Sequence, residues 1–131
     1  MNVENVKSAL TLKSIGFEEI HFIRRKIEDK ENRLYISVDG PEINGEQFTV
    51  TVQAQILGEG EYQLDTSLRA VFSIAGGLRD ENAFMLTNAV AIMFPYLRSE
   101  ITLLTSQPGI RPVVLPPINV QEVMKNRNQQ P

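Results

Sequence analysis

The stretch DENAFMLTNAVAIMFPYLRSEITLLTSQ, residues 80–107, decides the fold of this chain. Its apolar side chains recur every three or four residues, which is the spacing of one helical face. They are Leu86, Val90, Met93, Leu97, Ile101 and Leu104. Asp80 offers an N-cap side chain, and Pro108 with Gly109 ends the run. The pattern predicts one long helix.

Pro95 lies in the middle of this predicted helix. Because proline lacks the N–H that would bond the Ala91 carbonyl, we expect a kink there, or two helices that meet. Other apolar side chains widen the stripe beyond what one sheet face can cover. They are Phe84, Ala91, Ile92, Phe94 and Tyr96. We therefore expect a second partner for the helix, the alternative being a helix buried on all sides within one domain.

Composition bounds the class of protein. The chain has 131 residues, no cysteine and a formal net charge of -3. We expect a single domain over residues 1–131, with residues 1–9 and 126–131 flexible. The charge excludes the basic surface that nucleic-acid binding requires. The apolar block 83–97 is shorter than the roughly 20 residues of a membrane span. No signal peptide is apparent, so a cytoplasmic location is expected.

Four segments with alternating apolar residues predict antiparallel strands before the helix. The first, residues 10–22, changes parity twice, and we place bulges at Gly16 and at Glu18–Glu19. The second strand, from Leu34 to Val38, is expected to end at Asp39-Gly40-Pro41. Residues 48–56 and 62–72 form the third and fourth strands, joined as a hairpin through a glycine-rich turn.

Two further segments follow the helix. Residues 110–118, IRPVVLPPI, predict an extended segment along the surface, because its prolines cannot join a sheet interior. Asn119 and Glu122 resemble a capping box that opens a short helix through about Arg127. The order predicts an α+β fold, in which a four-stranded antiparallel sheet precedes a long kinked helix and a short C-terminal helix.

The sequence offers no catalytic or metal-binding constellation. His21 is the only histidine, and no cysteine exists to complete a nucleophile or a zinc site. Glu18 and Glu19 are adjacent on a predicted strand, so their side chains point to opposite faces. We find no phosphate loop and no dinucleotide fingerprint. We therefore predict no enzyme, no cofactor and no metal.

Three motifs resemble the SecB family of bacterial protein-export chaperones. They are FSIAGG at residues 72–77, MFPYLRSEIT at 93–102 and VVLPPINV at 113–120. The resemblance implies a homotetramer, a dimer of dimers in which the long helices pack between dimers. The interface residues would then be those of the helical stripe, namely Leu86, Val90, Met93, Leu97 and Ile101. A hotdog-type thioesterase or lipid binder is the alternative from another class, but there the long helix precedes most strands.

The resemblance also implies a function. SecB-like chaperones hold unfolded or non-native polypeptides in apolar grooves without ATP. The second strand and the last helix line these grooves, which points to Leu34, Ile36, Val38, Val123 and Met124. A SecB-like chaperone dedicated to an antitoxin of a toxin-antitoxin module would use the same grooves. The third hypothesis for the function is a purely structural oligomer that has no client groove.

The family's contact with the translocase motor SecA depends on acidic residues on the outer face of the sheet. Glu19 and Asp65 match two of these positions. Ile23 and Gln63 stand where the family has a further acid and a leucine, which argues against delivery to SecA.

Overall fold

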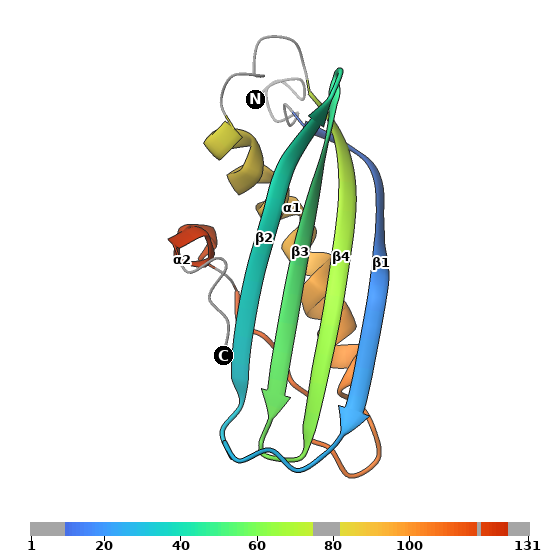
Figure 1. Ribbon diagram of the computed structural model, residues 1–131, viewed down its shortest axis with the longest axis vertical. Helices are drawn as coiled ribbons and strands as arrows, with labels where there is room; N and C mark the ends of the chain where they lie inside the picture. The colour runs from blue at the N-terminus through green and yellow to red at the C-terminus, as the bar shows by residue number, and fades with distance from the viewer. Residues whose placement is uncertain (1–9, 75–81, 118, 126–131) are drawn as a thin grey trace, which may run out of the picture.

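The computed structural model describes residues 10–74, 82–117 and 119–125. They form four strands followed by two helices (Figure 1). The elements are β1 Leu10–Arg24, β2 Arg33–Asn44, β3 Gln47–Gly58, β4 Tyr62–Ile74, α1 Asn82–Leu104 and α2 Val120–Lys125. The predicted α+β fold is confirmed in its order of elements. The expectations for the chain ends and for Asp80 lie outside the described residues.

The strands form one antiparallel sheet in the order β1-β4-β3-β2. Both helices lie on the same side of this sheet (Figure 1). The long helix α1 crosses behind the strands obliquely, from the upper part of β2 to the lower end of β1. Since β2 starts at the lower end, the helix leaves the beginning of that edge strand uncovered.

The two central strands supply most of the core. In β3 the even-numbered residues from Phe48 to Ile56 are buried, and the odd-numbered ones are more exposed. The inner face of β4 is likewise buried from Tyr62 to Ile74. The rings of Phe48 and Phe72 face each other across the two strands, with centroids 5.3 Å apart. The predicted hairpin of the third and fourth strands is confirmed.

The strand β1 contains both predicted parity changes. Its pairing with β4 shifts between Phe17 and Glu19, as expected for a bulge at Glu18. The other shift lies between Leu12 and Ser14, so the placement at Gly16 is wrong. Gly16 pairs regularly with Arg69, because the extra residue has already been absorbed earlier in the strand.

The strand β2 does not end at Asp39-Gly40-Pro41 as predicted. The pairing of β2 with β3 shifts between Asp39 and Glu42, so Pro41 lies in a bulge. Proline lacks the N–H that regular strand pairing needs, and a bulge does not require it. The strand then continues to Asn44. A tight turn then leads into β3, with Gly45 at φ 66°. This left-handed conformation suits glycine because it has no Cβ.

The helix α1 runs through Pro95 as one element, so the version with two separate helices is wrong. A bend at Pro95 stays a prediction. The ring of Pro95 lies on the exposed side of the helix. Its buried stripe packs on the sheet, and Leu97 is completely buried.

The five residues predicted for the oligomer interface lie within this packing. All five are at most 5% exposed within the single chain, because they cover the inner face of the chain's own sheet. They are Leu86, Val90, Met93, Leu97 and Ile101. These side chains leave little free surface for another subunit, and their place in an interface stays a prediction. The helix instead leaves Phe84, Tyr96 and Leu103 exposed.

Truncation of a central aromatic side chain tests this core. Phe72→Ala is expected to lower the free energy of unfolding by about 3–5 kcal/mol, because it removes a fully buried ring and leaves a cavity. Urea denaturation measures the change. Val114→Ala is the control, because Val114 is exposed and should cost less than about 0.5 kcal/mol. Equal losses in both variants would contradict the assigned core.

Candidate functional site

An apolar groove of about 210 Å³ opens where α1 leaves the start of β2 uncovered. Four parts of the chain form its walls, namely β2, α1, the extended segment before α2, and α2 itself. Its lining residues are Leu34, Ile36, Phe94, Leu115, Pro116, Pro117, Asn119, Glu122 and Val123. Most of these side chains are apolar, and the two polar ones, Asn119 and Glu122, come from around the start of α2. We call this site the client groove.

The wall from β2 follows from strand alternation. Leu34, Ile36 and Val38 pair with Ile56, Ala54 and Val52, which places them on the inner face of the sheet. Because β2 is an edge strand, its first residues have a neighbour on one side only. Leu34 is accordingly 39% exposed, and Ile36 is half-buried.

The structure brings together three of the five predicted client-binding residues, namely Leu34, Ile36 and Val123. Val38 lies two residues further along β2, nearer the helix, and is only 4% exposed. Val38 belongs to the core of the single chain, and its contact with a client stays a prediction. Met124 is half-buried against the core and is not among the lining residues, so its contact with a client stays a prediction.

Sequence reasoning missed the rest of the lining. Phe94 was placed only in the surplus apolar surface of the helix, yet it is 6% exposed and lines the groove. Leu115, Pro116 and Pro117 were expected along the surface, yet Leu115 is buried. A pair of prolines after a leucine was the available signal, but only the path of the chain shows that this segment returns to β2.

The short helix α2 begins as predicted. The Asn119 side chain accepts a hydrogen bond from the Glu122 backbone N–H at 3.2 Å, which caps the helix. Its described part ends at Lys125, which lies 3.8 Å from the Glu122 carboxylate. Val123 faces the groove, and no residue of α2 is fully buried. Such a short helix depends on contacts with its neighbours rather than on its own propensity.

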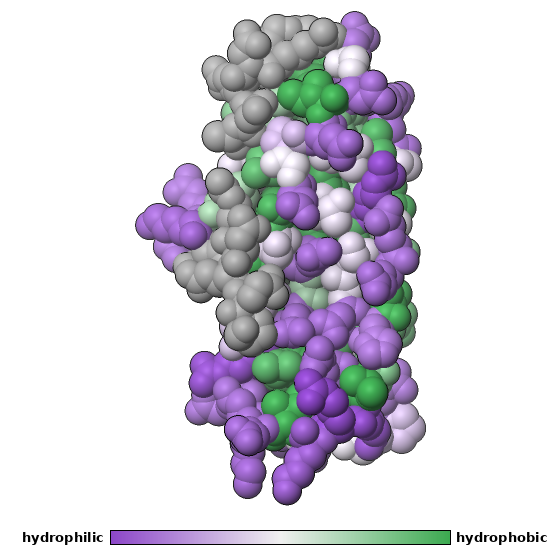
Figure 2. Space-filling view, viewed as in Figure 1, coloured by the Kyte–Doolittle hydropathy of each residue, from purple (hydrophilic) through white to green (hydrophobic). Residues whose placement is uncertain are grey.

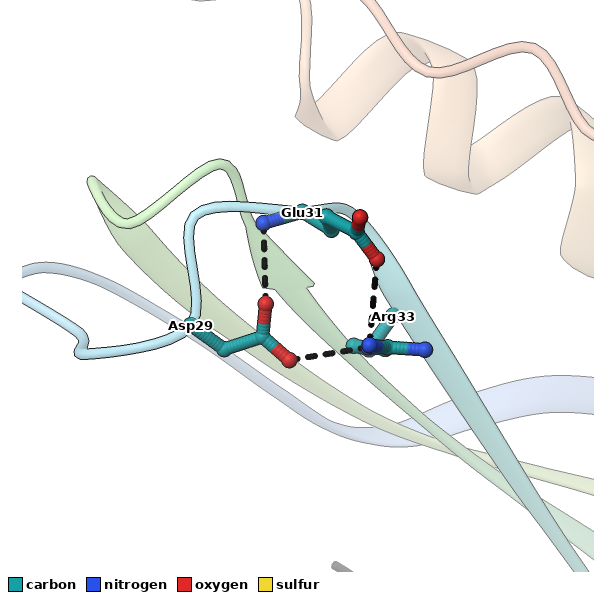
Figure 3. Close-up of polar contacts among 3 residues, drawn as sticks. All are labelled: Asp29, Glu31 and Arg33. Atoms are coloured by element: carbon teal, nitrogen blue, oxygen red, sulfur yellow. Dashed lines mark hydrogen bonds and ion pairs between the residues drawn. The ribbon is translucent and has the colours of Figure 1, made fainter.

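A loop fixed by charged groups leads into the β2 wall (Figure 3). One Asp29 oxygen accepts the Glu31 backbone N–H at 3.0 Å, and the other accepts Arg33 Nε at 2.8 Å. Arg33 also meets the Glu31 carboxylate at 3.0 Å. The two hydrogen bonds that Asp29 accepts, first from the Glu31 backbone N–H and second from the Arg33 guanidinium, hold the pKa of Asp29 below its ordinary value. Arg33 directly precedes Leu34, so the network fixes the start of the groove wall.

The outer face of the sheet is mainly polar, with a few apolar residues among the polar ones (Figure 2). Glu19 and Asp65, the predicted SecA-contact residues, lie there in one hollow of about 180 Å³. Both Asp65 oxygens already accept hydrogen bonds at 2.8 Å, one from the Gln55 amide and one from the Gln63 amide. Asp65 is therefore engaged within the sheet, whereas Glu19 is exposed.

The described residues contain no group of three or more His, Cys, Asp or Glu side chains that would hold a metal ion. His21 is exposed on β1. No helix in the described part of the chain is long and apolar enough to cross a membrane. The lining of the client groove is suited to apolar contact.

The comparisons with known proteins agree with this arrangement. Residues 9–131 match the family described as preprotein translocase subunit SecB, and the chain therefore belongs to the SecB family. This is a family of chaperones and not of enzymes, so the prediction of no enzyme is confirmed.

One relative in sequence and two solved structures illustrate the likeness. An uncharacterized protein of Methanocaldococcus jannaschii is 30% identical over 132 residues, which cover 92% of this chain and 85% of that protein. A SecB-like chaperone of Mycobacterium tuberculosis, solved with a peptide from the HigA1 antitoxin, has TM-score 0.67 at 12% identity and covers 85% of this chain and 91% of its own. A Streptococcus agalactiae protein of unknown function has TM-score 0.53 at 10% identity, over 82% and 96% of the chains. These structures share the fold.

Titration of Asp29 tests the loop that precedes the groove. Because its pKa is lowered in the folded state, Asp29 contributes stability above the ordinary carboxyl pKa, and this contribution is lost as pH falls through the lower folded value. Arg33→Gln should raise the Asp29 pKa, as measured by NMR of the side-chain carboxyl carbon. Lys30→Gln is the matched control and should change it less. An unchanged Asp29 pKa in Arg33→Gln would contradict the network.

Proposed function

We propose that this chain is an ATP-independent holdase, which binds non-native polypeptide segments in the client groove. The observation that carries the proposal is the apolar lining, which leaves Leu34 partly exposed beside Phe94 and Val123. A folded protein hides its apolar side chains, whereas an unfolded one presents them to such a groove. Binding the unfolded state alone opposes folding and aggregation by mass action, without a chemical step.

One groove of about 210 Å³ holds only a few client side chains. Burial of one apolar side chain contributes roughly 1.5–3 kcal/mol, so a single groove binds weakly. Several grooves linked in one particle gain avidity for a long client without reading its sequence. A chain with one weakly binding groove would therefore hold clients better as an oligomer.

We infer that the oligomer is a homotetramer that uses the outward face of α1. Tyr96 is 46% exposed and Leu103 is 65% exposed on the described part of that helix, and Phe84 is exposed near its start. Such aromatic and aliphatic side chains are typical of protein interfaces. This face replaces the buried stripe as the proposed interface.

A second candidate is a chaperone dedicated to an antitoxin. The similar chaperone of Mycobacterium tuberculosis was solved with an antitoxin peptide, and that observation favours this narrower client. Protein export with SecA is less favoured, because Asp65 is already bonded to Gln55 and Gln63. A SecA contact through Glu19 and Asp65 stays a prediction.

Suppression of aggregation tests the holdase. A chemically unfolded protein diluted from denaturant should stay soluble when the chain is present in stoichiometric amounts, as measured by light scattering. Leu34→Ser with Val123→Ser should weaken client affinity at least about tenfold, because two apolar contacts in the groove are lost.

Val114→Ser is the matched control, because Val114 is exposed and does not line the groove. It should leave suppression unchanged. Melting temperatures of all variants separate lost binding from lost folding. Unaltered aggregation with the wild-type chain would refute the holdase.

The solution mass tests the oligomer separately. Static light scattering should give about four times the mass of the chain. Tyr96→Lys with Leu103→Lys should lower that mass, because charges would then lie on the proposed interface. Leu34→Lys on the groove should leave it unchanged. A wild-type particle of single-chain mass would disprove the interface.

A further inference from the structure

One wall of the client groove belongs to a segment without regular structure. Leu115, Pro116 and Pro117 lie in residues 106–117, which belong to neither a helix nor a strand. Four prolines interrupt this segment, at positions 108, 112, 116 and 117. Proline has no backbone N–H, so these positions cannot be held by a ladder of backbone hydrogen bonds. Something else must fix the wall against β2.

The last turn of α1 and Thr105, the residue that follows the helix, fix the segment at Val113. The Val113 backbone N–H donates to Thr105 Oγ1 at 2.8 Å. The Val113 carbonyl accepts a hydrogen bond from Thr102 Oγ1, also at 2.8 Å. Two side chains thus satisfy both backbone groups of one residue, as a neighbouring strand would do in a sheet.

The hydroxyl of Thr105 is fully used in hydrogen bonds. Thr105 is 0% exposed, and its Oγ1 donates to the Ile101 carbonyl at 2.7 Å while it accepts from Val113. Donor and acceptor are therefore both engaged, which sets the orientation of the hydroxyl. A buried hydroxyl without partners would cost free energy, so this arrangement fixes the segment in one position.

We propose that Thr102 and Thr105 are positioning residues that set the width of the client groove. The inference rests on the proposed function, because it concerns the same groove. Val113 precedes Leu115 by two residues, and the prolines on either side restrict the chain between them. A fixed Val113 therefore holds Leu115, Pro116 and Pro117 opposite Leu34 and Ile36. A wall that is already in place costs the client no ordering free energy on binding.

The test uses variants of the full chain. Thr102→Val with Thr105→Val keeps the β-branched shape and removes both hydroxyls. Its affinity for a permanently unfolded protein, measured by fluorescence anisotropy, should fall about tenfold, as expected for two lost hydrogen bonds. Thr102→Ser with Thr105→Ser keeps the hydroxyls and should restore affinity to within about twofold of the wild type. Hydrogen exchange of the Val113 amide should accelerate in the valine variant only.

Two further measurements separate positioning from general stability. Thr102→Val alone leaves the buried Thr105 in place, and it should weaken client binding even if the double variant does not fold. In a Leu34→Ser background the same change should have a smaller effect, because the opposite wall has already been altered. A purely structural threonine would lower the melting temperature equally in both backgrounds, without this coupling.

The outcomes are distinct. If the wild-type chain binds no unfolded protein, the proposed function and this inference both fail. If the wild type binds a client, and the valine variant binds it equally while its Val113 amide exchanges faster, the positioning role alone is overturned. If the valine variant binds the client more weakly and the serine variant restores the affinity, the positioning role is supported.

Discussion

The structure depends on a mismatch of width between one helix and one sheet. Four strands about 4.8 Å apart place the outer strands roughly 14 Å from each other, whereas a helix with its side chains is about 10 Å across. The buried stripe of α1 from Leu86 to Ile101 packs on the inner face of the sheet. It contacts each strand over only part of its length, and its oblique crossing leaves the start of β2 uncovered (Figure 1). The apolar inner face of that edge is the origin of the client groove.

The same constraint explains the role of the C-terminal segment. The six-residue helix α2 and the proline-rich segment 106–117 cover the uncovered start of β2 only in part. Thr102 and Thr105 hold this segment at Val113 through hydrogen bonds, and Asn119 caps α2. The result is an apolar groove with a polar rim at Asn119 and Glu122. Such a surface recognises exposed apolar side chains, which agrees with membership of the SecB family.

Much of the fold was predictable from local patterns. The alternation in β3 and β4 and the three-and-four spacing of α1 each describe one face of one element. The facing partner of that stripe was not predictable, because spacing identifies a buried face without saying what buries it. The sheet order and the oblique crossing decided that Val38 is core while Leu34 is groove. Phe94 and Leu115 joined the site for the same reason, since long-range geometry brings them to β2.

The central claim is that clients meet the sheet edge that α1 leaves uncovered. Methyl NMR of the labelled chain, titrated with a permanently unfolded protein, tests it most directly. We expect the methyl signals of Leu34, Ile36 and Val123 to shift on binding, while those of Leu86, Val90 and Leu97 in the core stay in place. Shifts confined to residues outside the groove, or no shifts under conditions where the client binds, would contradict it.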